Sequence, residues 1–258
     1  MVSFRRRLAG VFVAALVATA CGGSDGPAQR PDGALSGSLT VLAASSLTEA
    51  FDEIGRRFEA ANRDVDVTFG YDASSTLAQQ VVNGAPADVL ATADEVTMQE
   101  AAAGGAVDAP ALFTRNRLAI LVRAGNPENV GRLADLARPG LVVVLCAEQV
   151  PCGRFSFTVL ERAGVRVRPM SLEPNVKGVV SKVMLGEADA GIAYATDALD
   201  AGQAVEAVVI PDAQNVVAAY PIAVVRSAPN RAAATALVDY VRSPAGQAVL
   251  ESFGFQPA

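Results

Sequence analysis

Four short stretches of this sequence place small or hydroxyl-bearing residues where a strand or loop feeds a helix. They are Ala43–Leu47, Asp72–Leu77, Val150–Gly153 and Asn175–Gly178. The start of a helix carries unpaired backbone N–H groups and a partial positive charge. Several such starts directed at one point can hold a small oxyanion without any charged side chain. The pattern therefore predicts an anion cradle made of uncharged donors.

The composition limits what such a cradle can belong to. The chain has 258 residues, of which 51% are hydrophobic and 19% charged, and this predicts a globular protein with one large domain or two lobes. Its net charge of −6 disfavours nucleic-acid binding, which needs a basic face. The same charge slightly repels free anions, so anion specificity must come from local dipoles and fit.

The types of residue that are missing exclude further classes of site. The sequence contains no His, the commonest general base and metal ligand. Its only cysteines are Cys21, Cys146 and Cys152, too few for a zinc cluster. We therefore expect neither a directly bound metal ion nor a cofactor.

The N-terminal region has the order of an export signal. Arg5–Arg7 precede an apolar run that is too short to span a bilayer, and a Gly- and Ser-rich stretch follows Cys21. We assign residues 1–20 to a signal peptide and residues 21–37 to a tether. The sequence before Cys21 resembles a bacterial lipobox, which implies lipidation of Cys21. Ala18 stands where such motifs usually carry Leu, so cleavage at a nearby small residue without lipidation is the alternative.

After residue 37, apolar runs alternate with helical patterns, which predicts an α/β fold with largely parallel sheets. The strand candidates are Leu39–Ala44, Val65–Phe69, Asp88–Thr92, Arg117–Val122, Leu141–Cys146, Ala190–Tyr194, Val205–Ile210 and Pro221–Val225. Two helices are expected at the end of the chain, at about Arg231–Arg242 and Pro244–Ser252.

Two helical stripes of apolar residues are expected to face the core. One consists of Leu47, Phe51, Ile54 and Phe58, and the other of Val176, Val179, Val180, Val183 and Met184.

Two extended segments stand where a first lobe would pass the chain to a second and later take it back. They are Arg117–Val122 and Pro221–Val225. This arrangement predicts two lobes joined by a pair of crossing strands, with a ligand cleft between them. The expected boundaries are 38–118 plus 222–258 for lobe I and 119–221 for lobe II.

Several motifs together carry a resemblance to a known family. They are Ala44–Thr48, Ala73–Ala78 followed by Asn83–Val89, Val150–Gly153, Asn175–Lys177 and Gly191–Ala198. In this order and at these spacings, the chain from about Leu39 to its end resembles the molybdate-binding proteins of bacterial ABC importers. The resemblance implies a two-lobed, type II periplasmic-binding-protein-like fold with two crossing hinge strands.

The resemblance also implies a ligand set. The family holds a tetrahedral oxyanion with two serines, two backbone N–H groups and a tyrosine. At the matching positions stand the Ser46 and Ser74 hydroxyls, the Cys152 and Val176 amides, and the Tyr194 hydroxyl. A buried dianion needs several charge-assisted hydrogen bonds to each oxygen, and hydroxyls and amides at helix starts supply them.

Each site residue also has a simpler interpretation. Ser46 with Glu49 matches a capping box, so Ser46 could cap its helix. Ser74 is an ordinary residue at a helix start, and Tyr194 could be a half-buried tyrosine at the end of a strand. Lys177 and Arg154 adjoin two of the predicted amides, and we expect them to lie outside the ligand's contact shell.

Cys152 stands where the family usually has a small residue such as Ala. Because the backbone N–H is the predicted donor, this substitution need not damage the site. In an exported protein, a local disulfide between Cys146 and Cys152 is favoured over free thiols. A catalytic thiol is disfavoured because the chain offers no His partner.

We therefore expect an exported monomer that is lipid-anchored to the outer face of the cell membrane, or periplasmic. It would bind molybdate and tungstate and deliver them to an ABC permease and ATPase, without catalysis. Two alternatives remain. The first is the same fold binding sulfate, phosphate or another oxyanion. The second is a serine or cysteine hydrolase, although the chain lacks both a Gly-x-Ser-x-Gly elbow and a histidine base.

Overall fold

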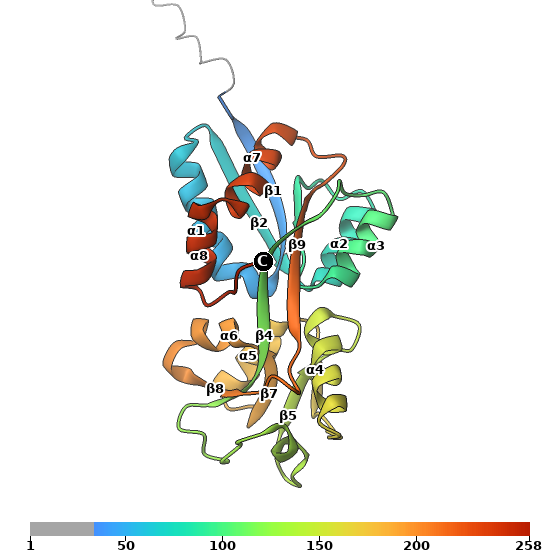
Figure 1. Ribbon diagram of the computed structural model, residues 1–258, viewed down its shortest axis with the longest axis vertical. Helices are drawn as coiled ribbons and strands as arrows, with labels where there is room; N and C mark the ends of the chain where they lie inside the picture. Colours follow the sequence, from blue (N-terminus) through green and yellow to red (C-terminus); the bar gives the residue numbers. More distant parts are fainter. Residues whose placement is uncertain (1–33) are drawn as a thin grey trace, which may run out of the picture. The chain divides into compact units, whose positions relative to one another are not determined.

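The computed structural model describes residues 34–258, of which residues 35–258 form one compact unit (Figure 1). The predicted signal peptide, Cys21 and most of the tether fall outside the described residues. Strand β1 begins at Gly37, the last residue assigned to the tether. In the described part of the chain, no helix has both the length and the apolar character that a membrane crossing requires.

One half of the sheet, which we call lobe I, is built from the N-terminal strands. Strand β1 (Gly37–Ala44) pairs in parallel with β2 (Val65–Asp72) and with β3 (Val89–Ala91). Its helices are the 3-10 turn η1 (Ser45–Leu47), α1 (Thr48–Ala61), α2 (Ser74–Val82), α3 (Glu95–Ala103), α7 (Arg231–Arg242) and α8 (Pro244–Ser252). The two C-terminal helices have the bounds that the sequence predicts.

Two long strands connect this half to the other (Figure 1). Strand β4 (Ala111–Arg123) pairs with β9 (Val217–Val224) through residues 111–117 and with the second half of the sheet through residues 118–123. Strand β9 also pairs with β3. The predicted pair of crossing strands is thus present, and both strands are longer than the apolar runs that indicated them. The residue boundaries proposed for the lobes remain a prediction.

The other half of the sheet, lobe II, has a second parallel core. Strand β5 (Val143–Cys146) pairs in parallel with β6 (Ser171–Glu173) and β7 (Ala190–Tyr194), while β8 (Val205–Val209) pairs with β4. Its helical segments are η2 (Leu133–Ala137), α4 (Pro151–Arg162), α5 (Val176–Met184), α6 (Ala195–Asp200) and η3 (Gly202–Ala204). The short strand β6 was not predicted.

The core confirms most of the two predicted stripes. Leu47, Phe51, Ile54 and Phe58 are at most 2% exposed, and the four valines of α5 are also buried. Met184 is a correction, because its side chain is 45% exposed. It is the last residue of α5, and the adjoining Leu185 is 73% exposed, so the apolar stripe leaves the core at the end of the helix.

The sheet is mixed rather than largely parallel. Each lobe has parallel strands at its centre, but the pairs made by β4 and β9 are antiparallel. The reason is topological, since the chain leaves lobe I along β4 and returns along β9 in the opposite direction. This returning pair brings elements far apart in the sequence to one junction.

Candidate functional site

All four stretches singled out in the sequence begin helices. Ser45 opens η1, which leads into α1, and Ser74 opens α2 in lobe I. Pro151 opens α4 and Val176 opens α5 in lobe II. Each lobe therefore contributes two helix starts, whose N–H groups and partial positive charges favour an anion.

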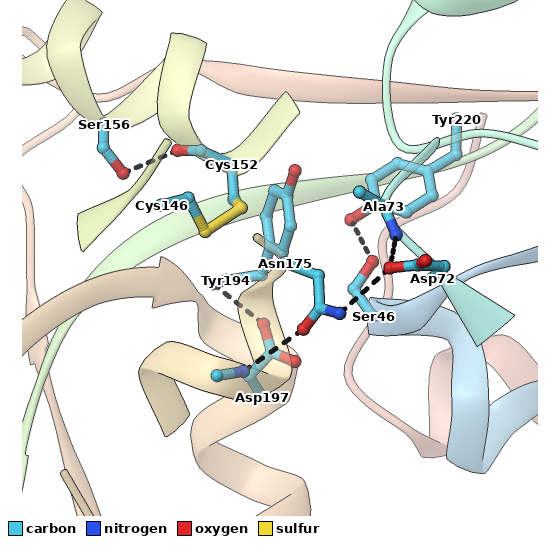
Figure 2. The surroundings of a disulfide bond; sticks show 11 residues. Ser46, Asp72, Ala73, Cys146, Cys152, Ser156, Asn175, Tyr194, Asp197 and Tyr220 are labelled. Atoms are coloured by element: carbon cyan, nitrogen blue, oxygen red, sulfur yellow. Dashed lines mark hydrogen bonds between the residues drawn. A yellow bond between two sulfur atoms is a disulfide. The ribbon is translucent and has the colours of Figure 1, made fainter. Parts of the chain in front are cut away.

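These helix starts surround one small cavity between β1, β2 and β7. Figure 2 shows the surroundings of a disulfide bond beside this cavity, with several of the lining residues labelled. The structure brings together the five residues predicted to bind the ligand, because the cavity is lined by Ser46, Ser74, Cys152, Val176 and Tyr194. Ala44, Ser45, Asp72, Ala73, Ala93, Val150, Pro151 and Asn175 complete its wall.

The two serines are buried and are not helix caps. The helices α1 and α2 have no side-chain capping bond at their start, so the capping interpretation of Ser46 does not hold in this structure. The Ser74 Oγ accepts a hydrogen bond from the Ala93 N–H at 2.9 Å. An amide N–H can only donate, so the Ser74 hydroxyl keeps its own proton for another acceptor. The Ser46 Oγ lies 2.9 Å from the Tyr220 hydroxyl.

Tyr194 closes the cavity from lobe II, at the last position of β7. Its side chain is 1% exposed, so it is fully rather than half buried. Within residues 34–258, its hydroxyl has no hydrogen-bond partner. A buried unpaired hydroxyl costs about 1–3 kcal/mol, so the Tyr194 hydroxyl is a donor left without an acceptor in this structure. Burial, reinforced by the neighbouring Tyr220 phenol and then by the Asp94 and Asp197 carboxylates, raises the pKa of Tyr194 well above its ordinary value, so the phenol remains a donor.

The backbone of Tyr194 is fixed by Asp197, which accepts the Tyr194 N–H at 3.1 Å through Oδ2 (Figure 2). Burial raises the pKa of Asp197 to about 6, although the charge of Lys177 opposes the shift. Its Oδ1 is buried without a hydrogen-bond partner among the described residues and lies 3.7 Å from the Lys177 ammonium.

The two predicted amides lie in the first turns of α4 and α5, where intrahelical acceptors do not exist. Pro151 has no N–H, so Cys152 supplies the first donor of α4. Asn175 caps α5 by accepting the Gly178 N–H and leaves Val176 at the first helical position.

The loop before α4 is tightly held. Cys146 and Cys152 form a disulfide bond that ties the end of β5 to the start of α4 (Figure 2). Gly153 packs so closely that a Cβ there would lie 1.9 Å from the Ala147 carbonyl oxygen. The position of the Cys152 amide therefore depends on a covalent link and on a residue without a side chain.

A polar contact beside the cavity joins the two lobes and was not predicted. The Asp72 Oδ1 accepts the Ala73 N–H at 2.7 Å and the Asn175 side-chain amide at 3.1 Å (Figure 2). Asp72 thus brings a carboxylate to the wall of the cavity, with one of its oxygens occupied by these donors. The contact spans 103 positions of sequence, so no local pattern signals it.

The two cations next to the predicted amides bind carboxylates of lobe I. The Arg154 guanidinium donates to Asp94, with Nε at 3.0 Å, and to the Thr97 hydroxyl. The Lys177 ammonium lies 2.8 Å from both oxygens of Glu49. Neither residue lines the cavity, and their place outside the ligand's contact shell stays a prediction.

The charged side chains around Lys177 shift one another's pKa values. Burial lowers the pKa of Lys177, but Asp197, Glu49 and Asp200 outweigh it and leave the pKa above its ordinary value. Burial and the adjacent Glu49 raise the pKa of Asp200 to about 7. For Glu49, burial is outweighed by Lys177, and the pKa is lowered. This cluster therefore adds an ionic contact between the lobes.

Apart from the Asp72 carboxylate, the polar groups described in this cavity are hydroxyls and amides that can donate hydrogen bonds. They suit a fully deprotonated oxyanion. In the described residues, no group of three or more Cys, Asp or Glu side chains is arranged to hold a metal ion.

Comparison with a family model gives a match from residue 39 to residue 256, to the bacterial extracellular solute-binding proteins. The chain belongs to this family. The match covers both halves of the sheet and all the residues that line the cavity.

Individual relatives of this chain agree with the resemblance found in the sequence. The molybdate-binding protein ModA of Mycobacterium tuberculosis is 41% identical over 248 residues, which cover 95% of this chain and 94% of the relative. Among solved structures, the periplasmic molybdate-binding protein of Azotobacter vinelandii has a TM-score of 0.75 and 19% identity, covering 85% of this chain and 99% of that one.

The sulfate-binding protein SubI of Mycobacterium tuberculosis has a similar fold, with a TM-score of 0.76, 23% identity, and coverage of 86% of this chain and 87% of that one. These likenesses confirm the predicted two-lobed, type II periplasmic-binding-protein fold. They also show that this fold is shared by proteins named for different oxyanions.

Proposed function

We propose that this protein binds molybdate, and also tungstate, outside the cytoplasm and delivers the anion to the permease and ATPase of an ABC importer. The proposal is supported by the 41% identity to a molybdate-binding protein over nearly the whole chain. It is also supported by the cavity, in which the residues matching the family's ligand set come from both lobes.

The observation that carries the proposal is the set of hydrogen-bond partners of the hydroxyl groups in the cavity. Ser74 has its oxygen occupied by an amide donor, so its proton is free to be donated. The Tyr194 hydroxyl is buried without a partner among the described residues. With the amides of Cys152 and Val176, these groups have O–H and N–H protons to donate to a ligand, which is the complement of a fully deprotonated tetrahedral anion.

The proposed mechanism is closure of the lobes around the anion. Moving an ion out of water costs on the order of 20 kcal/mol in the idealised limit, so the closed form needs donors from both lobes. Lobe I supplies Ser46 and Ser74, whereas lobe II supplies Cys152, Val176 and Tyr194. The anion would be held by fixed dipoles, and no cation stands in its contact shell. Release of the anion at the transporter therefore leaves no unpaired buried cation there, and the lobes can reopen.

Discrimination against other oxyanions would rest on size. Sulfate and phosphate are smaller tetrahedra than molybdate, so they would fit donors fixed in the two lobes less closely. Molybdate and tungstate are nearly equal in size, so both should bind.

We further propose that the protein has no catalytic role and acts as a monomer, anchored through Cys21 or free in the periplasm. The hydrolase alternative requires a base beside a nucleophile. Ser46 contacts a tyrosine hydroxyl, Ser74 contacts a backbone amide, and Cys152 is in a disulfide. The sequence contains no His to act as that base.

The proposal is tested by calorimetric titration of the ligand-stripped protein with molybdate, tungstate, sulfate and phosphate. We expect molybdate and tungstate to bind tightly, and sulfate and phosphate to bind far more weakly. Ligand at 100 times its dissociation constant should add about 2.7 kcal/mol to the free energy of unfolding, which thermal melting detects. Tighter binding of sulfate or phosphate would establish the alternative ligand. Absence of binding to all four anions, or covalent labelling by a fluorophosphonate, would refute the proposal.

A further inference from the structure

We propose that Tyr220 is a positioning residue of the site, and that its hydroxyl holds Ser46 in the orientation that donates a proton into the cavity. The inference rests on the proposed function, since it concerns how the same site recognises its anion. Tyr220 does not line the cavity and was not predicted from the sequence.

The geometry places Tyr220 between the two lobes. It lies on the returning strand β9, its side chain is 0% exposed, and its hydroxyl is 2.9 Å from the Ser46 Oγ of lobe I (Figure 2). Its ring also packs edge-on against Tyr194 of lobe II, with the ring centroids 5.8 Å apart. One side chain at the crossing strands therefore contacts both hydroxyl residues predicted to bind the anion from opposite lobes.

The direction of the hydrogen bond between the two hydroxyls determines what Ser46 can do. If Ser46 donates to Tyr220, its own proton is consumed and it presents only lone pairs to the cavity, which repel an anion. If Tyr220 donates, Ser46 accepts through its oxygen and its proton is free for the ligand. Ser74 is held in the second arrangement by the Ala93 amide. An anion in the cavity favours the same arrangement for Ser46, with Tyr220 in the place of the amide.

The surroundings of Tyr220 make its hydroxyl separable from its ring. Besides Tyr194, the ring packs against Phe113 and Phe255. Its centroid lies 6.5 Å from that of Phe113 and 5.7 Å from that of Phe255. Tyr220→Phe keeps these contacts and removes only the oxygen. The protein should therefore fold, and a change in anion affinity can be attributed to the hydroxyl.

The test is a double-mutant cycle in which molybdate is titrated calorimetrically into the native protein, Y220F, S46A and the double variant. Removal of one hydrogen bond is expected to weaken binding by about 3- to 10-fold in Y220F. In the S46A background, where no serine remains to be oriented, the same change should alter affinity by less than about 1.5-fold. Y240F is the matched control, because Tyr240 packs on Phe58 between α1 and α7, away from the cavity.

Two results would overturn the inference. The first is a Y220F variant that binds molybdate as tightly as the native protein. The second is an equal loss in the native and S46A backgrounds, because Tyr220 would then act through the general structure. The melting temperature of each ligand-free variant separates a loss of stability from a loss of orientation. A native protein that binds none of the oxyanions would instead refute the proposed function, so the two failures are distinguishable.

Discussion

Replacing Tyr194 by Phe is expected to weaken anion binding without weakening the fold. The Tyr194 hydroxyl is buried and unpartnered in the described part of the structure, so the ligand-free closed form gains nothing from it. A bound oxyanion would accept its proton in a charge-assisted hydrogen bond. The substitution therefore acts with opposite signs on the empty and the loaded protein, which an ordinary core substitution does not.

The magnitude follows from the type of bond. A hydrogen bond to a charged group contributes about 1.5–3 kcal/mol, so its loss should raise the dissociation constant by roughly 10- to 150-fold. In the empty protein, removing a buried hydroxyl that lacks a partner relieves a cost of about 1–3 kcal/mol in the closed form. The ligand-free melting temperature of Y194F should therefore equal or exceed that of the native protein.

The assay combines calorimetric titration of molybdate with thermal melting of the ligand-free protein, with Y240F as the control that loses a phenol oxygen elsewhere. Since the pKa of Tyr194 is raised well above its ordinary value, the native affinity should not decline through ionisation of this phenol between pH 7 and pH 9. Unchanged affinity in Y194F would refute the placement of this hydroxyl on the ligand. A lowered melting temperature would refute the argument that the hydroxyl is unsatisfied in the empty protein.

Two further predictions concern the groups that hold the site in place. Burial raises the pKa of Asp197 to about 6 from an ordinary 3.8, so the folded protein holds this proton more tightly than the unfolded chain does. The resulting contribution to the free energy of unfolding is fully present below about pH 4 and is lost as the pH rises through 6. The melting temperature of the native protein relative to D197N should therefore fall between pH 4 and pH 6 and stay level above, and a flat difference would contradict the buried titration. Gly153→Ala should lower the free energy of unfolding by about 1–3 kcal/mol and weaken molybdate binding, because its Cβ would meet the Ala147 carbonyl at 1.9 Å and displace the Cys152 amide. Gly131→Ala, where the nearest atom would be 3.7 Å away, is the control for chemical denaturation and titration; equal behaviour of the two variants would contradict the close-packing argument.

The strands and helices that depend on local pattern could be predicted closely. The bounds of α7 and α8 follow from apolar spacing and from the Ser243–Pro244 start. The three-residue strand β6 could not be predicted, because Ser171–Glu173 is short and polar and owes its structure to pairing with β5. Met184 was misplaced because helical spacing does not reveal at which residue the tertiary structure stops covering a helix face.

The same division applies to the site. The sequence by itself determined which residues begin helices and carry hydroxyl or amide donors, because caps, prolines and hydroxyl residues act within a few positions of the chain. Only the tertiary structure decided which distant residues contact those donors and the residues around them. Tyr220 lies 174 positions from Ser46, Asn175 lies 103 from Asp72, and Lys177 lies 128 from Glu49. The physical reason is that these contacts depend on how the two crossing strands and the closed lobes bring distant elements together, and no local periodicity encodes that arrangement.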